Sequence, residues 1–78
     1  MDTNDAILRL ASLVRADCGA SDAARSVINY AWNNHRPIRE FFRLDGANRK
    51  AALTLIDRDE WVDPQLLCDL IPELNDWV

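Results

Sequence analysis

The residues that could perform chemistry in this chain of 78 residues are few and scattered. His35 is the only histidine, Cys18 and Cys68 are the only cysteines, and Gly19 and Gly46 are the only glycines. Metal sites need three or four ligands at suitable spacing, and no C-x-x-C or H-x-x-x-H pattern occurs here. Two isolated glycines do not make a phosphate-binding loop. We therefore predict no catalytic residue, no metal site and no cofactor, and we do not expect an enzyme.

The two cysteines are too few for a disulfide framework. We expect Cys18 and Cys68 to be reduced, small hydrophobic residues buried at the ends of helices. The first residues lack the basic and apolar stretches of a secretory signal. No apolar run approaches the ~20 residues that span a bilayer. The sequence therefore predicts a cytoplasmic protein with no membrane partner.

Acidic side chains are concentrated in the second half of the chain, which has a net charge of −4 overall. Residues 1–44 contain six arginines against five acidic residues, whereas residues 45–78 contain three basic residues against eight acidic ones. A surface of this kind attracts a basic partner and repels an acidic one. The alternative is that the acids are helix caps and solvated outer faces. The predicted acidic face consists of Asp57, Asp59, Glu60, Asp63, Asp69, Glu73 and Asp76.

The three tryptophans are candidate anchors for a protein partner. Large aromatic side chains usually pack in the core or at its edge, and we expect this of at least two of them. A tryptophan left partly exposed is a common hot spot of binding energy. Trp61, which lies among the acidic residues between two expected helices, is the first choice. Trp77, beside the last residue of the sequence, is the second and is either docked or frayed.

Three arginines, Arg36, Arg39 and Arg43, form a predicted secondary basic face. The last two are four residues apart, which places them on one side of a helix. Phosphate binding usually needs a net basic face, so we do not expect direct nucleic-acid binding. Pairing of these arginines with the acidic segment, within the chain or across a homodimer, is the favoured interpretation.

Several stretches of the chain have apolar residues at helical spacing. Each begins with a residue that favours a helix start and ends with one that favours a helix stop. Thr3 or Asn4 is expected to cap a first helix, and Gly19 is placed to end it in the left-handed conformation. Ser21 is expected to cap a second helix. Pro37 suits the first position of a short third helix.

Two more helices are expected in the second half of the chain. Asp45 is expected to cap a fourth helix, and Asp63-Pro64 is expected to begin a fifth. Pro72 ends the fifth helix or begins a last turn. Loops of two to six residues place such helices side by side. The predicted fold is all-α, a compact bundle of five or six short helices. Residues 1–78 form one domain, in which an acidic extension over 57–78 packs on a core formed by 5–56.

Four short motifs within residues 6–56 carry a resemblance to a known family. They are Arg-Ala-Asp-Cys-Gly (15–19), Ala-Arg (24–25) leading to Tyr-Ala-Trp-Asn (30–33), Phe-Arg-Leu-Asp (42–45) and Ala-Ala-Leu-Thr-Leu-Ile (51–56). This segment resembles an uncharacterised family of small helical domains from bacterial mobile elements and prophages, and the family implies no catalytic residues. In size and charge the chain is also similar to anti-CRISPR proteins. That likeness implies an inhibitor that binds host machinery.

The leading hypothesis is therefore a non-catalytic inhibitor from a phage or mobile element. It would occlude a basic surface of a nucleic-acid-processing complex, such as a CRISPR-Cas subunit. Three alternatives stay open: a regulatory homodimer, a nucleic-acid-binding regulator with a helix-turn-helix-like core, and an enzyme built around His35.

Overall fold

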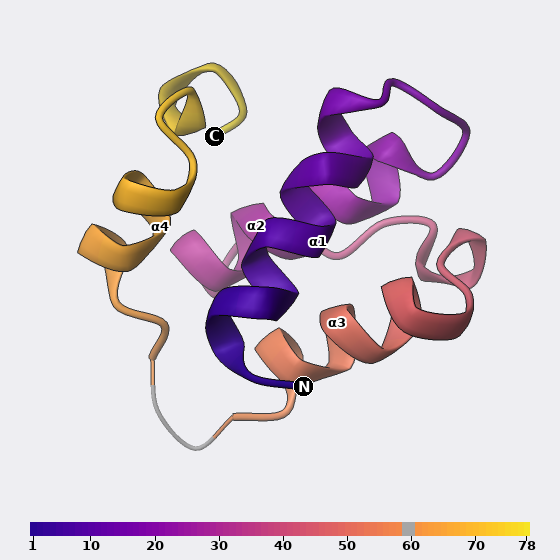
Figure 1. The fold of residues 1–78 in the computed structure, drawn as a ribbon, viewed down its shortest axis with the longest axis horizontal. Helices are drawn as coiled ribbons and strands as arrows, with labels where there is room; N and C mark the ends of the chain where they lie inside the picture. The colour runs from indigo at the N-terminus through magenta and orange to yellow at the C-terminus, as the bar shows by residue number, and fades with distance from the viewer. Residues whose placement is uncertain (59–60) are drawn as a thin grey trace.

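The computed structural model describes residues 1–58 and 61–78, and over these ranges the chain is helical without a strand. The four helices are α1 (Thr3–Arg15), α2 (Ser21–Trp32), α3 (Gly46–Ile56) and α4 (Pro64–Leu70) (Figure 1). Two single 3-10 turns cover Phe41–Arg43 and Leu74–Asp76. The predicted all-α class is confirmed. The predicted number of helices is wrong, because the described residues form four α-helices and two 3-10 turns where five or six helices were expected.

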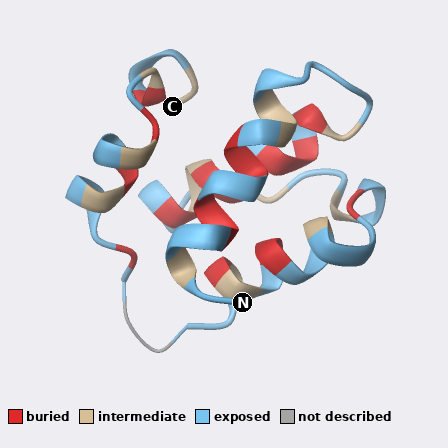
Figure 2. Cartoon of the chain, in the orientation of Figure 1, coloured by how far each residue is buried: buried red, intermediate tan, exposed pale blue. Residues whose placement is uncertain are grey.

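Helix α1 lies at the centre of the fold and packs against α2, α3 and α4 (Figure 1). Each of the first three helices turns a pair of alanines into the core, and all six are fully buried. Small side chains allow helices to approach closely, and the larger Ile7, Leu10 and Ile28 fill the space between them. Figure 2 shows the buried residues on the facing sides of these helices. The alanines are Ala6, Ala11, Ala23, Ala24, Ala51 and Ala52.

The C-terminal segment, residues 64–78, joins this core through Leu67, Ile71 and Leu74, which are at most 2% exposed. Asp63 and Pro64 begin α4 as predicted. The Asp63 carboxylate accepts the Gln65 backbone N–H at 2.9 Å, and Pro64 occupies the first helical turn. A proline suits this position because its missing N–H has no partner in the first turn of a helix.

The predicted ends of the first helix are wrong. Asp2, rather than Thr3 or Asn4, caps α1, and its carboxylate accepts the Asp5 N–H at 2.8 Å. The helix ends at Arg15, and Asp17, with φ of 50°, takes the left-handed conformation predicted for Gly19. Asp tolerates this conformation better than most residues because its short polar side chain bonds locally.

Ser21 is the first residue of α2 rather than its cap, and it joins the two helices instead. Its hydroxyl accepts the Cys18 N–H at 2.6 Å and donates to the Leu13 carbonyl at 2.9 Å. Asp45 occupies the cap position of α3 as predicted, but its side chain makes no capping hydrogen bond.

Residues 37–40 form no regular helix, which contradicts the predicted third helix. The backbone of Arg39 is held against α2 instead, because its N–H donates to the Ser26 hydroxyl at 2.9 Å. Glu40 then takes a left-handed conformation, with φ of 52°, before the short turn Phe41–Arg43. A tertiary contact with α2 therefore replaces the helix that Pro37 could have begun.

Candidate functional site

Trp61 lies in the segment between α3 and α4 with 68% of its surface exposed. The segment's described carboxylates, Asp57 and Asp63, are also exposed. Asp59 and Glu60, which belong to the predicted acidic face, lie outside the described residues. Trp61 borders a hollow of about 150 Å³ together with Tyr30 and other side chains. This arrangement presents an aromatic ring and two carboxylates on one connecting segment.

The remaining acidic residues are not equivalent. Asp69 accepts a hydrogen bond from the Gln65 side chain at 2.8 Å, and Asp76 is exposed. Glu73 is engaged with Arg15, whose guanidinium donates to it at 2.7 and 2.9 Å. These hydrogen bonds from Arg15 are the main reason why the pKa of Glu73 falls to about 2. Glu73 is therefore committed to a contact within the chain.

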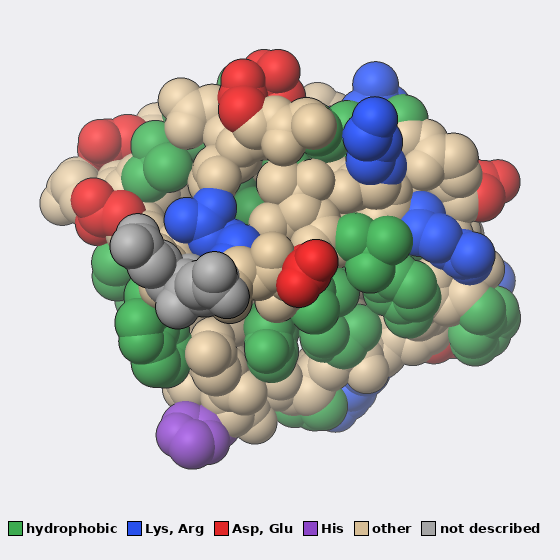
Figure 3. Space-filling view, turned by 90° about the horizontal axis from the view of Figure 1, so that it is seen from below, with side chains coloured by type: hydrophobic (Ala, Val, Ile, Leu, Met, Phe, Trp, Pro, Cys, Tyr) green, Lys and Arg blue, Asp and Glu red, His purple; other side chains and the backbone are tan. Residues whose placement is uncertain are grey.

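Figure 3 shows how side chains of different kinds are distributed on one face of the molecule. Hydrophobic side chains form a band across the lower half of this view, and acidic and basic side chains are interspersed around it. Among the described residues on this face, the acidic side chains lie at several separate places (Figure 3).

Trp77 is half-buried, so it is docked rather than frayed. The Arg15 guanidinium lies 5.7 Å from the centre of its ring, and the Arg25 side chain donates to its carbonyl at 3.1 Å. Through these contacts, Trp77 packs the end of the chain against α1 and α2. Of the two predicted anchors, Trp61 is the more accessible.

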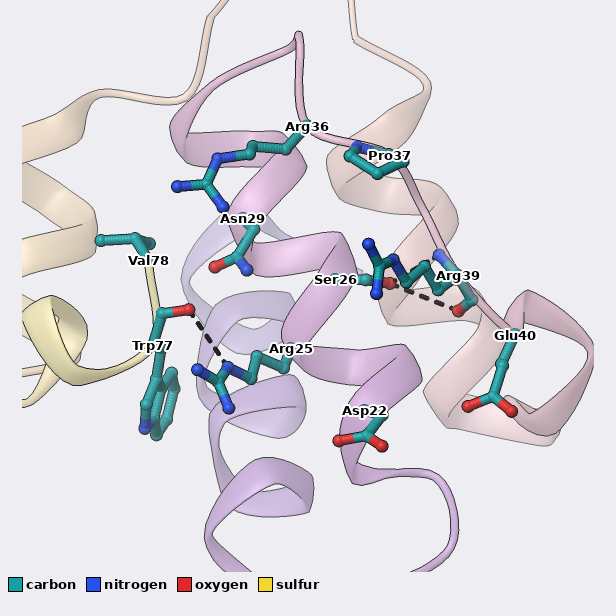
Figure 4. Close-up of a pocket in the computed structure, with 10 residues that line it drawn as sticks. All are labelled: Asp22, Arg25, Ser26, Asn29, Arg36, Pro37, Arg39, Glu40, Trp77 and Val78. Atoms are coloured by element: carbon teal, nitrogen blue, oxygen red, sulfur yellow. Dashed lines mark hydrogen bonds between the residues drawn. The ribbon is translucent and has the colours of Figure 1, made fainter.

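The predicted basic face is divided. Arg39 and Arg43 share no helix face, since no helix covers 37–40. Arg43 pairs with Glu40 at 3.2 Å rather than with the acidic C-terminal segment. Arg36 and Arg39 instead line a polar groove of about 560 Å³ with Arg25, which sequence reasoning did not single out (Figure 4).

Phe42 is a further exposed aromatic that sequence reasoning missed. It is 72% exposed, and the Arg43 guanidinium lies 5.6 Å from the centre of its ring. Phe41 beside it is half-buried and packs on the core. Two adjacent side chains of a 3-10 turn point about a third of a turn apart, so one of them faces solvent when the other faces the core.

Both cysteines are exposed and free, which contradicts the expectation that they are buried. Cys18 lies in the exposed connection between α1 and α2, and Cys68 lies on the outer face of α4. Hydrogen bonds from the Ala20 backbone and then from the Ser21 hydroxyl lower the pKa of the Cys18 thiol. Among the described residues, no three His, Cys, Asp or Glu side chains lie close enough to hold a metal ion.

No known protein family, curated protein or solved structure matches this chain. The resemblance of residues 6–56 to a prophage family stays a prediction. In the two described ranges, no helix combines the length and the apolar sequence needed to cross a membrane.

Proposed function

We propose that this chain is a non-catalytic protein-binding module that inserts Trp61 into a pocket on a basic partner surface. The observation that carries this proposal is the 68% exposure of Trp61 on a connecting segment that also holds the exposed Asp57 and Asp63. Transfer of its large apolar ring from water into a partner would be favourable. Tryptophan is also among the residue types that contribute most to binding hot spots.

The two carboxylates favour a basic partner over an acidic one. Both carboxylates are exposed, and the cap of α4 uses only Oδ1 of Asp63, so Asp57 and the second oxygen of Asp63 can meet lysine or arginine side chains. Exposed charges at the rim of an interface mainly raise the rate of association, and salt weakens their effect. In this proposal Trp61 supplies affinity, and the carboxylates supply steering and partner choice.

The partner that we propose is a nucleic-acid-processing complex, with a CRISPR-Cas subunit as one example. Such complexes hold phosphates on basic surfaces, and a ring flanked by carboxylates would compete for the same positive charges. In this proposal the chain is an inhibitor from a phage or mobile element. Its support is the charge and the exposed tryptophan of the segment between α3 and α4.

The proposal is tested by comparing three immobilised proteins in lysates of CRISPR-carrying bacteria: the wild type, Trp61→Ala and Phe42→Ala. Phe42 is a matched control, because it is similarly exposed but lies in a different turn. We expect a protein retained by the wild type and by Phe42→Ala to be lost with Trp61→Ala. With that partner purified, Trp61→Ala should raise Kd at least about 30-fold, as for other hot-spot residues.

Charge reversal tests the steering separately from the anchor. Asp57→Lys should slow association and make the rate less sensitive to salt, and it leaves the Asp63 cap of α4 intact. Thermal unfolding of Trp61→Ala should match the wild type, because truncating an exposed side chain usually changes stability little. If the folded Trp61→Ala variant retains every protein that the wild type retains, the proposed binding function is wrong.

A further inference from the structure

The groove beside α2 is a second candidate site, separate from the segment that carries Trp61. Four polar residues of α2 line it: Asp22, Arg25, Ser26 and Asn29. Their spacing places them on one face of the helix. Arg36, Arg39 and Glu40 line the groove from the segment that follows α2 (Figure 4). Its volume of about 560 Å³ lies within the range of small-molecule sites.

Two of the three arginines in the groove have unused side chains. Within the described part of the chain, the guanidinium groups of Arg36 and Arg39 make no hydrogen bond or ion pair. Arg25 donates through Nε and Nη2 to the carbonyls of Trp77 and Asp76, at 3.1 and 3.3 Å. A guanidinium carries five N–H donors, so Arg25 retains others for a ligand.

The backbone beside the arginines is held in place by α2. The Ser26 hydroxyl accepts the N–H of Arg39 at 2.9 Å and donates to the Ala23 carbonyl at 2.7 Å. Pro37, in the same segment as Arg36 and Arg39, restricts the backbone further because its ring fixes φ. Such a fixed backbone reduces the conformational entropy lost when a ligand binds.

We propose that this groove binds a phosphomonoester of a polyhydroxylated small molecule, either a sugar phosphate or a nucleotide. Guanidinium groups match phosphate oxygens in pairs, and three of them suit a phosphate dianion better than a single carboxylate. The phosphate is held by Arg25, Arg36 and Arg39. Hydroxyl groups of the ligand donate to the carboxylates of Asp22 and Glu40, which line the same groove.

The acidic residues of the groove favour a compact anion over a nucleic-acid strand. Asp22 and Glu40 line the same groove as the arginines. Glu40 is already paired with Arg43 at 3.2 Å, whereas Asp22 is exposed. A strand carries a phosphate at every nucleotide, so these carboxylates would repel its neighbouring phosphates. They can accept hydrogen bonds from the hydroxyl groups of a sugar.

The test is calorimetric titration of the 78-residue chain with glucose 6-phosphate and AMP, beside glucose, adenosine and inorganic phosphate. We expect saturable binding of at least one phosphorylated compound, weaker binding of inorganic phosphate and none of the uncharged parents. Which phosphorylated compound binds more tightly distinguishes a sugar phosphate from a nucleotide. Arg36→Ala and Arg39→Ala should each weaken binding at least about tenfold, as expected when charge-assisted hydrogen bonds are lost.

Arg9→Ala is the matched control, because Arg9 is an exposed arginine that lines a different hollow between α1 and α3. It should bind as the wild type does. The proposal is overturned if neither phosphorylated compound binds, if Arg9→Ala weakens binding as much as Arg36→Ala, or if a short DNA duplex binds more tightly than AMP.

Discussion

Arg15, the last residue of α1, holds Glu73, which lies 58 positions further along the chain, through two parallel hydrogen bonds. The Nε–Oε2 distance is 2.9 Å and the Nη2–Oε1 distance is 2.7 Å. The same guanidinium lies 5.7 Å from the centre of the Trp77 ring. Paired bonds of this kind fix direction as well as distance. One side chain of α1 therefore holds both the carboxylate and the ring of the C-terminal segment.

Glu73→Gln should loosen the C-terminal segment at neutral pH. Arg15 lowers the pKa of Glu73 from 4.5 to about 2, so the pair stabilises the fold fully above the unfolded value. This contribution is lost as the pH falls from about 4.5 to about 2. We expect the indole N–H signal of Trp77 to shift over this range in the wild type and to show no such step in Glu73→Gln. Asp76→Asn, which removes a neighbouring exposed carboxylate, should leave this pH-dependent shift of the Trp77 signal unchanged. If the shift disappears in Asp76→Asn, its assignment to Glu73 is wrong.

Cys18 should react faster than Cys68 with thiol reagents near neutral pH. Both thiols are exposed, but the Ala20 backbone and the Ser21 hydroxyl lower the pKa of Cys18. A lower pKa increases the fraction of reactive thiolate. Iodoacetamide alkylation of the single-cysteine variants Cys68→Ser and Cys18→Ser measures each thiol alone. We expect alkylation to be several-fold faster for the protein that retains Cys18. If the two variants react at equal rates at every pH, the hydrogen bonds assigned to the Cys18 thiol do not stabilise its thiolate.

The two glycines should respond in opposite ways to alanine. Gly46 has φ of +51°, so Gly46→Ala should lower the free energy of unfolding by about 1–2 kcal/mol although its Cβ meets no atom. Gly19 lies outside the left-handed region, and a Cβ there would be 3.9 Å from the nearest Arg43 nitrogen. Gly19→Ala should therefore be neutral or stabilising, by up to about 1 kcal/mol. Urea unfolding measures the free energy of unfolding of both variants. If Gly19→Ala is the less stable of the two, the φ values on which the prediction rests are wrong.

The sequence predicts those features that depend on local interactions. Asp63 and Pro64 begin α4 because the capping carboxylate and the proline ring act within one turn. Pro37 is equally compatible with a helix start and with irregular backbone. The Ser26 hydroxyl of α2, a partner distant in sequence, decides between them through Arg39. Local signals therefore predicted the helical class better than they predicted the third helix.

The candidate sites show the same limit. The connecting position of Trp61 could be predicted, but its 68% exposure depends on how α3 and α4 pack. The polar stripe of α2 that contains Arg25 and Asn29 is visible at helical spacing in the sequence. The groove exists only because the segment with Arg36 returns along this stripe, and no local signal specifies that path.

Leu10 and Leu8 provide the last prediction, because they lie two residues apart in α1 and face opposite environments. Leu10 is fully buried, whereas Leu8 is 42% exposed beside the hollow between α1 and α3. Leu10→Ala should lower the free energy of unfolding by about 2–5 kcal/mol through lost burial and a cavity. Leu8→Ala should change it by about 0.5 kcal/mol or less. Since α1 packs against α2, α3 and α4, we expect Leu10→Ala to destabilise the whole chain in one cooperative transition. Similar losses for both variants in urea unfolding would mean that α1 turns a different face to the core.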